Sequence, residues 1–231
     1  MRKFYNVIQI IFIIMNLISA NSFNSITSRR SLMTNTLLFA NTNYINENRN
    51  NKILLNESNQ HKNNDIYFNG QINEENCFQL SQALSQCKHL ALSNQDYPDH
   101  INLHIQSPGG SLLPTLALVD EIKNYEIDIH TYIRGYAASA ATLLSVVGKK
   151  RYINKHSLMM IHGVKLNEHH VSTVLDIKDL NYNVDLFMSI ISDIYLENSK
   201  INKKTLFELL DHDIWINSNK ALEFGLVDEI L

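Results

Sequence analysis

The chain has 231 residues, and its 20 lysines and arginines against 23 aspartates and glutamates give a net charge of −3 at pH 7. A chain of this length suits one domain that buries a sizeable hydrophobic core. The charges are scattered and slightly negative in sum, which argues against nucleic acid as the main partner. Cys77 and Cys87 fall within one predicted helix and lack the spacing of metal ligands, so neither a disulfide nor a metal site is expected.

The first 64 residues differ in composition from the rest of the chain. Two basic residues and an apolar run over 7–18 predict a signal peptide over 1–22, and the run is too short for stable membrane insertion. Residues 23–46 are rich in serine, threonine and asparagine and contain no acidic residue, as in an organellar transit peptide. We therefore expect a transit-like leader and disordered linker over 23–64. A signal followed by such a tract resembles the bipartite leader of proteins sent to a plastid bounded by extra membranes, which implies delivery to the stroma. The alternative is an ordinary signal peptide followed by a disordered linker.

The remainder, 65–231, is expected to fold as one α/β domain. Its apolar residues alternate in some segments and recur at helical spacing in others. These patterns predict strands over 66–68, 101–106, 127–133, 151–153, 158–161, 214–216 and 226–230, and helices over 74–90, 112–125, 139–147, 171–197 and 218–225. Strand–helix units in succession imply right-handed crossovers and a largely parallel sheet.

The helix predicted over 171–197 is the longest in the chain. Its apolar residues are spaced alternately by three and four, as along a heptad seam, at Ile177, Leu180, Val184, Phe187, Ile191 and Ile194. At the rise of an α-helix it would be about 40 Å long, more than a domain of this size can cover. We expect it to project as a handle and to pack against another subunit. Burial in the core alone is the alternative.

The stretch from Gly135 to Gly148 has the pattern of a strand end, a tight turn at Gly135 and a buried helix with Ser139 in its first turn. A helix N-terminus offers unpaired backbone N–H groups and the positive end of the helix dipole, which favour an oxyanion beside the serine. This placement makes Ser139 a candidate nucleophile. The alternative is an N-capping serine on a core helix.

Two glycines and Ser111 precede the helix predicted over 112–125. Because Gly109 and Gly110 carry no side chains, their backbone N–H groups can reach an oxygen closely. No lysine follows them as in a phosphate-binding loop, which disfavours a nucleotide site. The sharper hypothesis is an oxyanion hole formed by the N–H groups of Gly110 and Ala140 beside Ser139.

A nucleophilic serine needs a base, and His162 ends an apolar strand where α/β sheets present catalytic groups. Its imidazole can take the Ser139 proton and return it to a leaving amine. Asp213, beside another apolar strand, is the candidate orienter of that imidazole. The alternatives are a buried structural histidine and a turn aspartate. Lys165 and Glu168 are expected to be solvated, and surface or loop positions are expected for His104, His130, His156, His169, His170 and His212.

Several short motifs, in order along the chain, carry a resemblance to a known family. They are Ser107-Pro108-Gly109-Gly110, Gly135-Tyr136-Ala137-Ala138-Ser139, Met160-Ile161-His162, Asp213 two residues before Trp215, and Ala221 with Gly225-Leu226-Val227-Asp228. Together they resemble the ClpP family, the proteolytic subunits of the Clp protease, over about residues 65–231. The resemblance implies an α/β ClpP/crotonase-like fold with a projecting handle helix. It also implies a serine endopeptidase with Ser139 as nucleophile, His162 as base and Asp213 as orienter.

The same resemblance implies an oligomer. A ring-forming homo- or hetero-heptamer would stack with a second ring as a tetradecamer, with the helix over 171–197 as the contact between rings. Substrates would be unfolded polypeptides delivered by a Clp ATPase unfoldase. The ATP belongs to that partner, because this chain has no nucleotide motif of its own, and no cofactor is expected.

The chain departs from the usual family pattern near these motifs. Ala140 replaces the methionine that usually follows the nucleophile, Gly163-Val164 replaces a Gln-Pro pair, and residues 165–168 replace a glycine-rich tract. The amino-terminal segment that lines the family's axial pore is not recognisable before Asp65. These departures fit a divergent subunit, and the main alternative is a non-catalytic or weakly active structural subunit of a mixed ring. A crotonase-type acyl-CoA enzyme, which shares the fold and the oxyanion hole, is the third interpretation.

Overall fold

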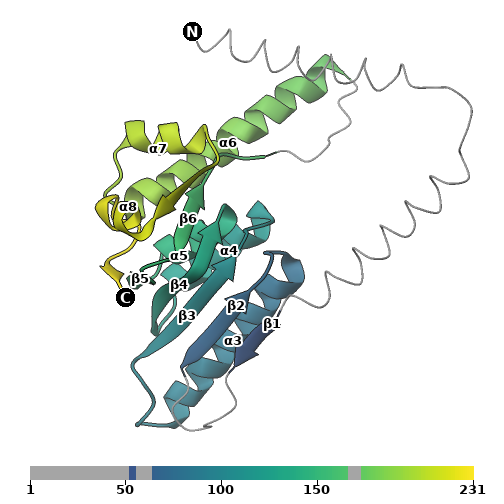
Figure 1. The fold of residues 1–231 in the computed structure, drawn as a ribbon. Coiled ribbons are helices and arrows are strands. Elements are labelled where there is room, and N and C mark those ends of the chain that lie inside the picture. The colour runs from purple at the N-terminus through teal and green to yellow at the C-terminus, as the bar shows by residue number, and fades with distance from the viewer. Residues whose placement is uncertain (1–51, 56–63, 166–172) are drawn as a thin grey trace, which may run out of the picture. The chain divides into compact units, whose positions relative to one another are not determined.

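An eight-stranded mixed sheet organises the residues that the computed structural model describes, which are 52–55, 64–165 and 173–231 (Figure 1). The strands are β1 (Lys52–Leu55), β2 (Asp65–Asn69), β3 (His100–Ser107), β4 (Asp128–Ala138), β5 (Lys150–Ile153), β6 (Leu158–Ile161), β7 (Ile214–Asn217) and β8 (Glu229–Ile230). The helices are α3 (Glu74–Ser93), α4 (Leu112–Lys123), α5 (Ala140–Val146), α6 (Val174–Asn198), α7 (Lys203–Leu210) and α8 (Ser218–Glu223). The strand order is β1-β2-β3-β4-β5-β8, and β6 pairs with β4 and with β7.

Most of the sheet is parallel, as the alternation of strands and helices predicted. The strands β2, β3, β4, β5 and β8 pair in parallel with one another in that order, and β6 is parallel to β4. Only β1 and β7, among the described strands, pair antiparallel. The inward residues of β3 are fully buried because they face helices across one continuous core, and that core includes Ile101, Leu103, Ile105, Leu80, Leu84, Leu118 and Leu144.

The described fold begins earlier than the boundary expected at Asp65. Strand β1 pairs with β2 along its whole length, inside the segment that was expected to be disordered. Three apolar residues after Lys52, between asparagine-rich flanks, are too few to indicate a strand without the partner that hydrogen-bonds to it. The expectations for the signal peptide over 1–22, and for the transit-like leader up to residue 51, lie outside the described residues.

Helix α7 was not among the predicted helices. Asn202 caps it, since its side-chain oxygen accepts a hydrogen bond from the Thr205 N–H at 3.0 Å. Leu206, Leu209 and Leu210 form its buried side. The cap and this spacing are both visible in the sequence, but an eight-residue pattern is short beside the long helix that precedes it.

The turn expected at Gly135 is wrong, because β4 continues to Ala138. Gly135, with φ +78°, lies instead in an irregular part of the strand where the pairing of β3 with β4 shifts register between Ile105 and Ser107. After this bulge β4 pairs with β6, and this pairing extends the strand. The chain therefore turns into α5 at Ser139 itself.

A row of stacked rings crosses one face of the sheet. Tyr67, His104, Tyr132 and Tyr152 are register partners on four adjacent strands. Successive ring centroids lie 4.6, 4.8 and 4.6 Å apart. The expectation that His104 and His130 lie at the surface or in loops is wrong, because both are strand residues and His130 is only 7% exposed. Stacking across strands covers rings that face outward from a single strand.

Helix α6 confirms the prediction of one long helix. It has 25 residues, about 37 Å, and begins at a capping box made by Thr173 and Asp176. Its fully buried residues are Ile191, Ser192 and Tyr195, all in the C-terminal third. The N-terminal part extends beyond the sheet (Figure 1). The first residues of the predicted helix, 171 and 172, lie outside the described part.

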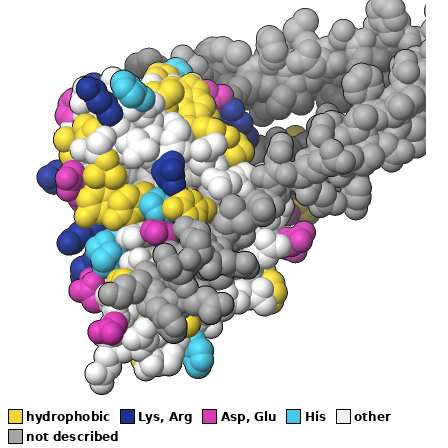
Figure 2. Space-filling model, turned by 60° about the horizontal axis from the view of Figure 1, so that its bottom comes forward, with side chains coloured by type: hydrophobic (Ala, Val, Ile, Leu, Met, Phe, Trp, Pro, Cys, Tyr) yellow, Lys and Arg dark blue, Asp and Glu magenta, His cyan; other side chains and the backbone are white. Residues whose placement is uncertain are grey.

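Within the described residues, no helix is long and apolar enough to cross a bilayer, and no three His, Cys, Asp or Glu side chains are grouped as metal ligands. Cys77 and Cys87 are buried free thiols, and burial raises the pKa of Cys77 to about 11. On the face that Figure 2 shows, acidic and basic side chains are interspersed and do not gather into a patch of one sign. The described residues on that face therefore form no basic patch of the kind that binds nucleic acids.

Candidate active site

Ser139 lies at a strained turn between β4 and α5. Its φ of 56° and ψ of −131° make it the only described residue other than glycine with a positive φ. Such a backbone persists only when the surroundings hold it. Here the Ser139 N–H donates to the carbonyl oxygen of Met160 at 2.8 Å, and the Ser139 carbonyl oxygen accepts from the Thr142 N–H at 2.9 Å. A strained strand-to-helix turn is also the geometry that presents a nucleophilic serine in α/β hydrolases.

A buried hydrogen-bond chain connects this turn to α6, the long helix that is called the handle helix from here on. The Thr142 hydroxyl donates to the Ser139 carbonyl oxygen at 2.5 Å. Because a hydroxyl has one proton, the 2.5 Å contact between Thr142 Oγ1 and the Tyr195 hydroxyl must be donated by Tyr195. Tyr195 is 2% exposed, and burial raises its pKa. The phenol therefore stays protonated and holds α6 against the start of α5.

Gly109 and Gly110 bring a second backbone segment against Ser139. A side chain at Gly109 would meet the Ala138 carbonyl oxygen at 2.6 Å and Ser139 Cβ at 2.7 Å. Gly109 also has φ +89°, so glycine is required there both for space and for backbone conformation. The Gly109 carbonyl oxygen accepts from the Ile72 N–H at 2.9 Å, which fixes the loop to the segment after β2.

Two backbone donors face the same cavity as Ser139. In the bridge between Ile72 and Gly110, the Ile72 carbonyl oxygen accepts from the Ser111 N–H, so the Gly110 N–H points the other way. Gly110 and Ala140 both line the pocket that contains Ser139. Neither of their N–H groups donates a hydrogen bond to another described residue. They are the donors that the oxyanion-hole hypothesis requires.

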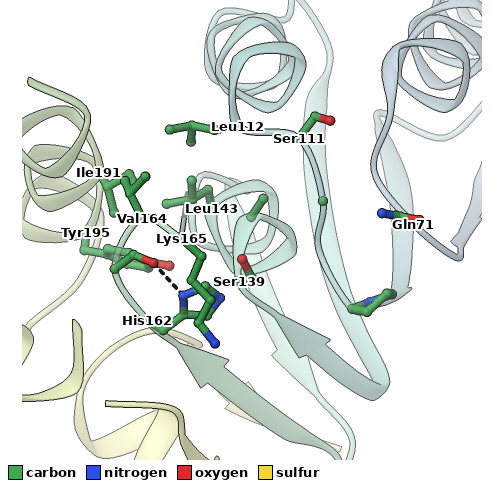
Figure 3. Close-up of a pocket in the computed structure, with 14 residues that line it drawn as sticks. Gln71, Ser111, Leu112, Ser139, Leu143, His162, Val164, Lys165, Ile191 and Tyr195 are labelled. Carbon is green, nitrogen blue, oxygen red and sulfur yellow. Dashed lines mark hydrogen bonds between the residues drawn. The ribbon is translucent and has the colours of Figure 1, made fainter. Parts of the chain in front are cut away.

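The pocket has a volume of about 410 Å³ and lies between the start of α5, the handle helix and the segment 162–165 (Figure 3). Its apolar wall consists of Leu112, Leu143, Val164 and Ile191. Ser139 and His162 both line it, and in Figure 3 their side chains face the same part of the cavity. Among the lining residues, only Lys165 carries a permanent charge.

Sheet register explains why residues far apart in sequence meet here. Ala138 pairs with Met160 in the parallel ladder, so the next residues on the two strands lead to Ser139 and toward His162. In the antiparallel ladder of β6 with β7, Ile161 pairs with Ile214. One further step of that ladder places His162 opposite Asp213. The three residues thus gather where β4, β6 and β7 end or begin.

His162 has the tautomer that a general base needs, although its partner is not the expected one. Its Nδ1 lies 2.5 Å from the Gly163 carbonyl oxygen, shown by the dashed line in Figure 3. A carbonyl oxygen only accepts, so Nδ1 carries the proton and Nε2 of the neutral ring is left as an acceptor. No hydrogen bond joins His162 to Ser139 or to Asp213 among the described contacts.

Asp213 is engaged elsewhere. Its Oδ2 lies 2.5 Å from the Lys165 ammonium, and both side chains are more than half exposed. The hydrogen bond from Lys165 holds the pKa of Asp213 below its usual range, and the positive charge that His162 carries when protonated acts in the same direction. Asp213 is therefore close to His162 but bonded to Lys165. The exposure of Lys165 confirms the expectation that it is solvated, but sequence reasoning missed its contact with Asp213, and Glu168 lies outside the described residues.

The arrangement defines an α/β protein with a serine, a histidine and two backbone donors in one pocket. Residues 48–231 match the model of the Clp protease family. The chain belongs to this family.

Curated relatives agree with this assignment. The chain is 29% identical over 168 residues to the ATP-dependent Clp protease proteolytic subunit 1 of Chlamydia trachomatis serovar D, covering 72% of this chain and 85% of the relative. It is 32% identical over 144 residues to the proteolytic subunit 3 of Streptomyces coelicolor, covering 62% of this chain and 65% of that relative. These identities make the chain a divergent member of the family.

The hydrogen bond between Tyr195 and Thr142 predicts that Tyr195→Phe lowers the free energy of unfolding by about 1 kcal/mol, because a buried hydrogen bond is lost without creating a cavity. Urea unfolding measures this change. Tyr182→Phe, on the exposed part of the same helix at 70% exposure, is the matched control and is expected to leave stability unchanged. Equal effects of the two variants would contradict the role given to the Tyr195 hydroxyl.

Proposed function

We propose that this chain is a serine-type endopeptidase subunit that hydrolyses peptide bonds of unfolded polypeptides. The observation that carries the proposal is the strained Ser139 turn in a pocket with two unpaired backbone donors and an imidazole whose Nε2 can accept a proton. Family membership supports hydrolytic chemistry in general. In this proposal Ser139, His162 and Asp213 are the catalytic residues.

The reaction follows from these groups. Ser139 Oγ attacks the carbonyl carbon of the scissile bond while His162 Nε2 takes the hydroxyl proton. The Gly110 and Ala140 N–H groups stabilise the negative oxygen of the tetrahedral intermediate. The imidazolium then gives its proton to the leaving amine, and a water molecule, deprotonated in the same way, releases the acyl group from Ser139. The cycle uses no metal or cofactor.

This mechanism predicts that a fluorophosphonate probe labels Ser139 covalently in the native assembly, and that Ser139→Ala abolishes the labelling. Intact-mass spectrometry of the labelled chain measures the adduct. Ser111→Ala is the matched control, because Ser111 lines the same pocket and its side chain makes no capping hydrogen bond at α4. It should label like the unmodified chain, and labelling that survives Ser139→Ala would assign the nucleophile elsewhere.

The second candidate function is a structural subunit of a mixed ring with little or no peptidase activity. The observation that favours it is the engagement of Asp213 by Lys165, which leaves His162 with a backbone carbonyl in place of a carboxylate. In serine proteases, loss of the orienting carboxylate lowers kcat by about 10⁴-fold. Absence of labelling in the native assembly would support this second function over the first.

We also propose that α6 joins subunits within a ring-forming assembly, a double heptamer. Large apolar side chains are exposed along the N-terminal half of α6, at Val174, Leu175, Tyr182 and Leu186. Leu186 follows Ile177 of the predicted seam by nine residues, half a turn around the helix at about 100° per residue. Apolar residues on opposite sides of a projecting helix favour burial against other chains.

This assembly predicts that Leu186→Asp shifts the protein toward smaller species in sedimentation velocity, because a carboxylate would be buried in the contact between rings. Asn183→Asp adds the same charge to an exposed polar position of the helix and serves as the control. An unchanged sedimentation profile for Leu186→Asp would place the contact elsewhere.

Two further parts of the proposal concern partners and location. A Clp ATPase would unfold substrates and deliver them, and the ATP would be used by that partner. The composition of 1–22 and 23–64 supports delivery to the stroma of a plastid bounded by extra membranes.

The two-part leader predicts that residues 1–64 carry a fluorescent protein into such a plastid. A fusion with residues 23–64 alone should stay in the cytosol, because it lacks the signal that starts translocation. Fluorescence microscopy in a cell with a plastid of this kind distinguishes the two. Secretion of the longer fusion would instead support the ordinary signal peptide.

A further inference from the structure

The three residues that follow His162 contain the alternative partners of both His162 and Asp213. The Gly163 carbonyl oxygen accepts a hydrogen bond from His162 Nδ1, and the Lys165 ammonium donates one to the Asp213 carboxylate. The ladder of β6 with β7 ends where Ile161 pairs with Ile214, and one further step of that register would bring His162 opposite Asp213. The two groups that register brings together are therefore kept apart by one short segment.

We propose that Lys165 is a positioning residue that withholds Asp213 from His162 in the resting chain, so that releasing Lys165 allows the carboxylate to orient the imidazole. The proposal rests on the proposed peptidase function. It concerns the same site but assigns to Lys165 a role that acts through Asp213 and not on the substrate.

The exposure of the ion pair determines how strong such a contact can be. The Lys165 side chain is 61% exposed and that of Asp213 is 55% exposed. Exposed ion pairs shift an equilibrium by about fivefold at most, and salt weakens them. Lys165 therefore acts as a reversible brake. In the native assembly, a partner or substrate that offers the ammonium another anion would release it.

Release of Asp213 from Lys165 would change the charge of the group that bonds to His162. A carbonyl oxygen holds the correct tautomer, but it carries no full charge with which to stabilise the imidazolium formed during attack. The Asp213 carboxylate does, and the hydrogen bond from Lys165 keeps the pKa of Asp213 low, so that the carboxylate is ionised when it is released. The tautomer is thus set in the resting chain, and only the charged partner is missing.

The test compares second-order rates of fluorophosphonate labelling in the full-length native assembly. Lys165→Met is expected to label about two- to fivefold faster than the unmodified chain, because the competing cation is gone. Lys165→Arg keeps the charge and should label at the unmodified rate. In the background of Asp213→Asn, the Lys165→Met change should bring no gain, as a coupling between the two residues requires.

Lys204→Met is the matched control, because it removes another exposed lysine that pairs with a carboxylate, Glu208, and does not line the pocket. Labelling of the unmodified chain should also rise with salt, whereas labelling of Lys165→Met should not, which a purely structural role would not produce. A gain with Lys204→Met, no gain with Lys165→Met, or a gain that persists without Asp213 would overturn the proposal.

A crystal structure of Lys165→Met separates this proposal from the proposed function. The expected result is a hydrogen bond from His162 Nδ1 to the Asp213 carboxylate. If no variant is labelled, the peptidase function fails, and this bond alone decides whether Lys165 keeps the two residues apart. An Asp213 carboxylate that stays away from His162 in the variant would overturn the positioning role even in an active enzyme.

Discussion

The hydrogen bonding of β6 to its two neighbours is the constraint on which the site depends. The parallel ladder with β4 carries the chain to the Ser139 turn, and the Met160 carbonyl oxygen holds the N–H of that turn at 2.8 Å. The antiparallel ladder with β7 ends where Ile161 pairs with Ile214, so that His162 and Asp213 are the next residues on the two strands. One four-residue strand thus sets the positions of three side chains that lie far apart in the sequence.

The strain at Ser139 is balanced by contacts from several elements. The Thr142 hydroxyl and N–H both bond to the Ser139 carbonyl oxygen, and Tyr195 of the handle helix donates to Thr142. Gly109 permits the neighbouring loop to approach the turn closely. Because the handle helix contributes Tyr195 and Ile191 to the pocket, a shift of that helix would change the contacts that hold the nucleophile in place. The contact between subunits and the chemistry would then share one structural element.

The family motifs favour a peptidase, whereas the segment after His162 favours a structural subunit. The serine, the histidine and the two backbone donors occupy one pocket, as a peptidase requires. Gly163 and Lys165 supply alternative partners for His162 and Asp213 at positions where this chain departs from the family pattern. The same short segment therefore bears on both the active interpretation and the scaffold interpretation.

The amino-acid pattern was enough to predict the α/β class, the largely parallel sheet, the long helix, and the places of Ser139 at the start of a helix and of His162 after a strand, because these depend on local periodicity and on short motifs. It misplaced the turn at Gly135, since a bulge can extend a strand only when β3 and β6 are there to pair with it. It also missed β1 and the contact of Lys165 with Asp213, because each needs a partner distant in the chain. Which carboxylate faces which cation was decided by the tertiary structure alone, since sheet register and side-chain reach set that pairing.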